Sequence, residues 1–155
     1  MIRQLDRSAA TIADILAAAR KLFASEGFDA TSIDDIAANA GVAKGAVYHH
    51  FASKEAIFTR VLEDVQAEIA AMPPPAATRA MTDPLDQIAA ETLRYLLAAT
   101  EPSRKRILLI DGPAVIGWKK WREIDDRFFG AGAKAAMALV LGAKASSREV
   151  DAVTH

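Results

Sequence analysis

A short stretch of the chain carries four side chains that can contact a polyanion, at Lys44, Tyr48, His49 and His50. The ammonium of Lys44 lies at the start of a predicted helix and suits a phosphate or the edge of a guanine base. Tyr48 can pack its ring on a sugar or a thymine methyl group while its hydroxyl bonds a phosphate. The pattern favours nucleic-acid contact, against the simpler alternatives of a solvated lysine and a half-buried core tyrosine.

The two histidines do not have the spacing of a metal site. Neighbouring residues on a helix point about 100° apart, so His49 and His50 cannot share one ion in the usual i, i+4 manner. The chain has no cysteines, which excludes disulfides, zinc ribbons and thiol chemistry. It also has no Glu-x-x-His pair, phosphate loop or nucleophile elbow. We therefore expect no enzyme activity and no metal or organic cofactor.

Residues on either side of this stretch extend the candidate surface. Gly45 has no side chain and lets the backbone approach a partner closely, although it can equally serve only to loosen the turn. Lys54 lies in the first turn of the next predicted helix, where a positive charge opposes the helix dipole. Together with the free amides of that helix start, it can hold a phosphate. Thr31 and Ser32 offer hydroxyls near the same place, although helix capping by itself explains Ser32.

The charge balance limits how such a surface can work. The chain has 19 basic and 20 acidic residues, and its formal net charge is -1. This excludes a strongly basic, histone-like binder, so that any DNA contact depends on where the cations lie. A hydrophobic share of 52% and a charged share of 25% are typical of a globular chain. The sequence shows no signal peptide and no membrane-spanning run, which predicts a cytoplasmic location.

The elements that would position these residues are all predicted to be helices. Apolar residues recur with helical periodicity throughout, and no alternating strand pattern is present. The linker is expected at 73–82, after Pro73-Pro74-Pro75, and a sharp break at Asp111-Gly112-Pro113. The expected helices span 9–25, 32–40, 44–50, 53–72, 84–99, 102–110 and 118 to about 130, with a continuation towards 141.

Two short helices joined by a glycine-containing turn form a helix-turn-helix between Ser32 and Phe51. Gly41 opens the turn, and Ala37 is small enough for the two helices to cross closely. The stretch Thr31-Ser32-Ile33-x-x-Ile36-Ala37, then Gly41-Val42-Ala43-Lys44-Gly45-Ala46-Val47-Tyr48-His49-His50-Phe51, then Ser53-Lys54-Glu55-Ala56-Ile57-Phe58, resembles the N-terminal domain of the TetR (tetracycline repressor) family. The resemblance covers about 11–62. The region 106–125 also resembles the ligand-domain region of some family members.

The resemblance implies an architecture and a function. It implies an all-α fold with a three-helix DNA-binding domain at 1–52 and a helical effector-binding and dimerisation domain at 53–155. Tyr48, His49 and His50 match positions that meet DNA, with His49 reading a base and His50 contacting a phosphate. It further implies a homodimeric repressor on a palindromic operator, released by a small apolar or aromatic effector. The alternative is a helical interaction module, or a truncated regulator fragment, with little DNA binding of its own.

The remaining two thirds of the chain are expected to form the sensor. Aromatic residues in an aliphatic background can line a ligand pocket, and plain core packing is the alternative for each of them. Family members carry two further long helices that form the dimer interface, and the sequence to His155 is expected to lack them. Trp118 and Trp121 are three apart and share one helix face, which makes them ligand candidates. The full set of ligand candidates is Tyr95, Trp118, Trp121 and Phe128.

Overall fold

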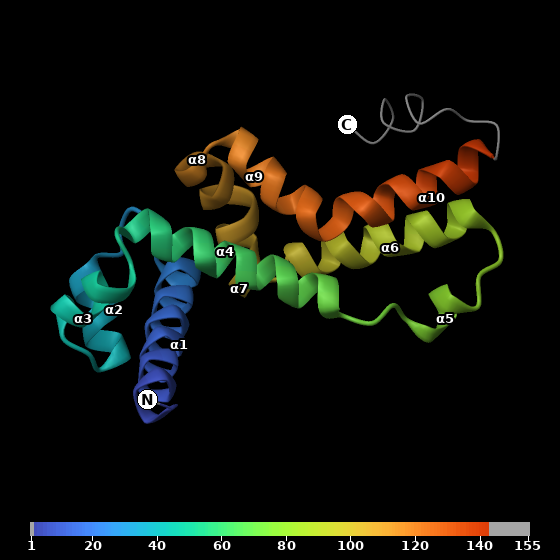
Figure 1. Ribbon diagram of the computed structural model, residues 1–155. Coiled ribbons are helices and arrows are strands. Elements are labelled where there is room, and N and C mark those ends of the chain that lie inside the picture. The colour runs from blue at the N-terminus through green and yellow to red at the C-terminus, as the bar shows by residue number, and fades with distance from the viewer. Residues whose placement is uncertain (1, 143–155) are drawn as a thin grey trace.

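The structure, a computed structural model, describes residues 2–142 and is built from helices (Figure 1). The all-α prediction is confirmed, and no strand occurs within those residues. None of the described helices is both long enough and apolar enough to span a bilayer. The elements in chain order are α1 (Ile2–Ser25), α2 (Ile33–Ala40), α3 (Lys44–His50), α4 (Lys54–Ala71), α5 (Ala76–Arg79), α6 (Pro84–Ala99), α7 (Pro102–Lys105), η1 (Arg106–Asp111), α8 (Gly112–Ile116), α9 (Trp118–Asp125), η2 (Asp126–Gly130) and α10 (Ala131–Leu141).

The first three helices begin and end where local chemistry dictates. Gly27 follows α1 with a φ of 91°, and Gly41 follows α2 with a φ of 68°, both in the region that favours glycine. Ser32 and Asp35 form a complete capping box at the start of α2. The predicted bounds of α3 are confirmed, but α1 begins at Ile2 and not near residue 9. Thr11 lies inside this helix, and its hydroxyl donates to the Arg7 carbonyl one turn earlier.

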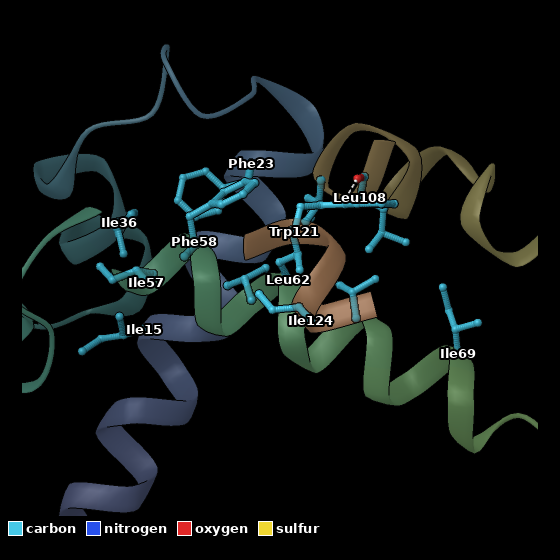
Figure 2. Close-up of a cluster of buried hydrophobic side chains, with 14 of the residues drawn as sticks. Ile15, Phe23, Ile36, Ile57, Phe58, Leu62, Ile69, Leu108, Trp121 and Ile124 are labelled. Carbon is cyan, nitrogen blue, oxygen red and sulfur yellow. Dashed lines mark hydrogen bonds between the residues drawn. The ribbon is translucent and has the colours of Figure 1, made fainter. Parts of the chain in front are cut away.

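Helix α4 is the central element of the core and touches both halves of the molecule. It buries an apolar face along its whole length, from Ile57 and Phe58 to Ile69, and both ends lie where the sequence predicts them (Figure 2). Near its start, Phe58 packs edge-on against Phe23, with ring centroids 5.2 Å apart. Farther along it packs against Leu108 and its neighbours, so one continuous core serves both ends of the chain.

The predicted break at 111–113 is wrong. The chain stays helical from Pro102 through the π-helical turn η1 to Ile116, and the break comes at Gly117, which has a φ of 78°. Gly112 is needed for close packing and not for a turn. A Cβ on Gly112 would lie 2.8 Å from Trp121 and 2.9 Å from Leu62. Pro113 follows the π-helical turn η1 directly, and the Leu108 carbonyl of that turn accepts instead from the indole N–H of Trp121.

The second half of the chain packs α6 against α10 (Figure 1). Asp83 caps α6 and Pro84 opens it, as the sequence predicts. The predicted linker contains one short helical turn, α5. After Gly117 the chain runs helically through α9, the π-helical turn η2 and α10 to Leu141, which confirms the expected continuation.

Candidate functional site

One face of α3 is packed into the core of the helix-turn-helix, and the opposite face is exposed to solvent. Val47 is fully buried, and it packs in the same core as Ile36 and Ala37 of α2. The turn is tied by a bond from the Val42 amide to the Ala37 carbonyl. Because α3 has only seven residues, this packing decides which of its side chains point away from the core.

The outward face of α3 carries most of the predicted contact residues. Tyr48 is 53% exposed, and Lys44, Gly45 and His49 are exposed as well. A Cβ on Gly45 would meet nothing within 4 Å, so no internal contact requires glycine there. The His50 ring is partly buried and lies edge-on to His49, with centroids 4.9 Å apart. Neither histidine belongs to a cluster of metal-ligating side chains among the described residues.

In the free protein, Lys44 forms an ion pair with an acidic neighbour. Its ammonium lies 2.9 Å from the Asp34 carboxylate of α2, and this bond raises the pKa of Lys44. Both side chains are more than half exposed, so the pair is screened and weak. A phosphate can therefore replace Asp34 as the partner of Lys44 with little loss of free energy.

Lys54 holds the loop before α2. Its Nζ donates to the carbonyls of Phe28, at 2.7 Å, and Thr31, at 2.8 Å, and lies 4.2 Å from the centroid of the Phe28 ring. An ammonium has three N–H donors, so one remains for a phosphate. These bonds account for the lysine that the sequence leaves unexplained at a helix start.

The two hydroxyl candidates differ in position. Thr31 is only 2% exposed, and its hydroxyl donates to the Gly27 carbonyl at 2.8 Å. This burial removes Thr31 from the surface, so we leave it out of the interface proposed below. Ser32 is exposed, and its hydroxyl is engaged with Asp35 in the capping box.

The end of α1 and the loop that follows it are also bonded from the second half of the chain. The Phe28 amide donates to the Asp111 carboxylate at 2.9 Å, and an Arg106 N–H donates to the Ser25 carbonyl at 3.3 Å. The Arg106 guanidinium lies so close to Gly27 that a Cβ there would be 2.6 Å from its Nε. Both bonding residues belong to the π-helical turn η1, a type of turn that is common at functional sites.

A second tie runs through α4. Glu68 accepts from Arg20 of α1 at 2.6 Å and from Arg104 of α7 at 2.7 Å. The bond from Arg104 is the main reason that the pKa of Glu68 is lowered, while partial burial opposes it. The orientation of the helix-turn-helix is thus coupled to the second half of the chain by side-chain bonds as well as by the shared core.

A cavity of about 660 Å³ lies between the end of α4, α6, η2 and α10. Tyr95 and Phe128 line it, as predicted. Trp118 and Trp121 do not. Their rings stack 5.1 Å apart, as the three-residue spacing suggests, but Trp121 is a core residue whose indole N–H bonds the Leu108 carbonyl (Figure 2). Phe129, an aromatic residue of the same region, lines the cavity as well. Sequence reasoning missed Ile88 and Met137, whose apolar spacing is indistinguishable from that of core residues.

One carboxylate at the cavity wall has an unusual environment. Asp125 accepts bonds from the Tyr95 hydroxyl at 3.2 Å and the Gln66 side-chain amide at 3.1 Å. Burial raises the pKa of Asp125, and the two bonds and the charge of Arg122 oppose that rise without cancelling it. Burial and the Asp125 charge raise the pKa of Tyr95 to about 12. Tyr95 therefore keeps its proton and acts as the donor.

Fold and site together define a helix-turn-helix domain joined through a shared helix to a helical domain with a cavity. Residues 15–61 match the family described as "Bacterial regulatory proteins, tetR family". Residues 85–155 match "Tetracyclin repressor-like, C-terminal domain". The chain belongs to the TetR family, which is a family of transcriptional regulators and not of enzymes.

Individual relatives agree with this assignment. The HTH-type transcriptional regulator AcrR of Shigella flexneri is 33% identical over 97 residues, which is 63% of this chain and 45% of AcrR. The repressor KstR2 of Mycolicibacterium smegmatis is 45% identical over 51 residues, which is 33% of this chain and 25% of KstR2. This chain therefore matches less than half the length of either relative.

Solved structures show the same fold over nearly the whole chain. A TetR-family transcriptional regulator from Pectobacterium atrosepticum has a TM-score of 0.70 at 27% identity, covering 96% of this chain and 78% of that one. A tetR-family structure from Shewanella has a TM-score of 0.69 at 24% identity, covering 93% and 77%. The predicted family and fold are thereby confirmed.

Proposed function

We propose that this chain is a repressor that binds operator DNA through α3 and is released by a small molecule in the cavity. The observation that carries the proposal is the outward face of α3. Lys44, Gly45, Tyr48 and His49 are exposed there, and no internal contact explains the glycine. An α-helix that packs on its domain through one face and exposes the other can enter the major groove of DNA. The cytoplasm, where bacterial DNA lies, is the compartment that this function requires.

The proposal assigns roles along this face. Lys44 and Tyr48 contact phosphates and base edges, His49 reads a base and His50 contacts a phosphate, as the family resemblance implies. Beside α3, the Ser32 hydroxyl and the remaining N–H donor of Lys54 meet the backbone of the duplex. The few cations involved predict a modest salt dependence of affinity, because each phosphate contact releases a counterion.

We further propose that two copies act together on a palindromic operator. A dimer would place two α3 helices about 34–36 Å apart, one turn of the duplex. The support is an apolar strip on α6, where Leu93, Leu96 and Leu97 are between 50% and 65% exposed. Light scattering on the full chain is expected to give a mass twice the 16.6 kDa of one copy. A measured mass of 16.6 kDa would contradict the dimer.

Helix α4 is proposed to carry the effector signal. It begins at Lys54, which bonds the loop before α2, and its last turn includes Ala70 at the cavity wall. A ligand that prefers one position of this helix shifts the population between DNA-binding and non-binding arrangements. The bonds of Arg106 and Asp111 to the same loop give that shift a second route to α3.

The test is affinity for a duplex selected from a random-sequence library, measured by fluorescence anisotropy at fixed salt. Lys44→Ala and Tyr48→Ala are each expected to weaken binding about tenfold or more, because each removes a contact worth about 1–3 kcal/mol. Asp34→Asn is expected to strengthen binding, since it frees Lys44 and removes a negative charge beside the duplex. Lys119→Ala, an exposed lysine on α9, is the matched control and is expected to change nothing.

Two results would count against this function. If the full chain selects no duplex, or if Lys44→Ala and Tyr48→Ala both keep the affinity of the unchanged protein with their melting temperatures intact, α3 is not the contact surface. The helical interaction module would then be the better account.

A further inference from the structure

We propose that the cavity takes an apolar or aromatic molecule that carries a protonated amine, with Asp125 as its counter-ion. This inference rests on the proposed function, because it names the chemical class of the effector. It follows from the charges, the hydrogen bonds and the rings that surround the cavity.

The charges at the cavity wall leave an excess of one negative charge. The ionisable acids and bases that line it are Glu91, Arg94 and Asp125. Glu91 and Arg94 neutralise each other across 2.8 Å, and Arg94 is further held by the Ile69 carbonyl at 3.1 Å. The third, Asp125, accepts bonds from two neutral side chains, those of Tyr95 and Gln66. The charge of Arg122 also acts on Asp125, and Arg122 forms an ion pair with the neighbouring acid Asp126 at 3.4 Å, so these three ionised groups together keep one negative charge.

Both neutral donors of Asp125 bond the same carboxylate oxygen. Tyr95 and Gln66 both donate to the same oxygen, Oδ1, so neither of them serves Oδ2. Gln66 is fully buried, and its own carbonyl oxygen has no hydrogen-bond partner within the described part of the chain. Asp125 itself lines the cavity, so a ligand N–H group can donate to its carboxylate without displacing either bond at Oδ1.

The rings beside Asp125 also favour a cation. Phe129 lies edge-on to Tyr95, with centroids 4.9 Å apart, and Phe128 adjoins it at 6.5 Å. The faces of aromatic rings attract ammonium groups, most strongly where water is excluded. Farther from Asp125, Ile88 and Met137 give the wall an apolar lining for the rest of the molecule. A volume of about 660 Å³ lies within the usual range for small organic ligands.

Three probes that share one aromatic body test the proposal directly. Naphthylmethylamine, naphthylmethanol and naphthoate differ in carrying a positive charge, no charge and a negative charge. Calorimetric titration of the full chain at neutral pH is expected to rank the amine first, about tenfold tighter than the alcohol, and the carboxylate last. Asp125→Asn is expected to abolish the preference for the amine over the alcohol. Glu123→Gln, an exposed acid on the same helix that does not line the cavity, is the matched control and should preserve it.

The same titrations can overturn the proposal. Equal affinity for the amine and the alcohol, tighter binding of the carboxylate, or binding of none of the three would each refute an amine-binding site. A preference that survives in Asp125→Asn would refute Asp125 as the counter-ion. The Asn side chain is close in shape to Asp, so we expect the variant to fold. A circular dichroism melt checks this. DNA binding through α3 is measured separately, so the proposed function can stand if this inference fails.

Discussion

At the residue scale, the structure explains two residues whose sequence context left alternatives open. Lys54 lies where a cation opposes the helix dipole, and its bonds to the carbonyls of Phe28 and Thr31 account for its presence. Gly45 could have served only to loosen a turn, but it lies inside α3 with open space beside it. No contact within the described residues requires glycine at this position.

Gly45→Ala should separate stability from DNA binding. Alanine is the better helix former, so the free energy of unfolding is expected to rise by up to about 1 kcal/mol. The added methyl group would lie between α3 and the duplex, so DNA affinity is expected to fall. Gly132→Ala is the matched control, since Gly132 also lies in a helix with no atom near its Cβ position. It should gain stability and keep its DNA affinity, and unchanged DNA affinity in Gly45→Ala would contradict the assigned role.

Asp125 should make the unliganded protein less stable at neutral pH. Its pKa is raised above the ordinary 3.8, so the folded state binds the proton more tightly than the unfolded chain does. The destabilisation is therefore absent below about 3.8 and develops as the pH rises through the raised pKa. The charged and polar groups around it, Tyr95, Gln66, Arg122 and Asp126, do not reverse this direction.

Asp125→Asn is accordingly expected to melt at a higher temperature than the unchanged protein at neutral pH. Asparagine can still accept the bonds at Oδ1, and it carries no charge to bury. The advantage should shrink as the pH falls towards 4. Thermal melts over a pH series measure this. A variant that melts lower at neutral pH, or a difference that does not change with pH, would contradict the account of Asp125.

At the element scale, local signals predicted the helix-turn-helix well. Side-chain caps, glycine stops and proline starts act within a few residues, so both ends of α2 and the starts of α4 and α6 follow from the sequence. The failure at Gly112 is different in kind. Next to a proline, Gly112 looked like a breaker, but the contacts that require it come from other helices, from Trp121 of α9 and from Leu62 of α4.

The cavity shows the same limit. Tyr95 and Phe128 were predicted because they are large and aromatic, and so were Trp118 and Trp121, which do not line it. Asp125 was not predicted, because nothing local marks a carboxylate that tertiary packing partly buries. Periodicity shows which helix face is apolar, but only packing decides whether that face meets another helix or encloses a space.

The bridge that Glu68 makes between α1 and α7 should have a defined pH dependence. Its pKa is lowered below 4.5, so its stabilisation is present above that value and is lost as the pH falls through the lowered pKa. Glu68→Gln is expected to lower the free energy of unfolding at neutral pH by about 0.5–1 kcal/mol, a small value because the side chain is 38% exposed. Chemical denaturation at neutral and acidic pH measures it.

A second variant on α4 separates this bridge from an ordinary surface pair. Asp64 pairs with Arg60 one turn away on the same helix, so Asp64→Asn is expected to change stability by only a few tenths of a kcal/mol. If Glu68→Gln is equally mild, or if its effect persists in acid, Glu68 does not couple the two halves of the chain.

At the scale of the whole molecule, the two halves share one core and one long helix. The buried cluster runs from Ile15 and Phe23 through α4 to Leu108 and Ile124 (Figure 2). Helix α3 lies beside the start of α4 (Figure 1), and the cavity lies at the last turn of α4. A change at the cavity therefore has one continuous helix and two sets of polar contacts through which to reach α3.

The proposed function depends above all on where DNA contacts the chain. The most direct measurement is the shift of each backbone amide resonance in the full chain on addition of the selected duplex. The largest shifts are expected at 44–50 in α3, with smaller ones at Ser32 and at the start of α4. If the shifts gathered instead on the apolar strip of α6, or if no amide of α3 moved, the chain would not read DNA through this helix.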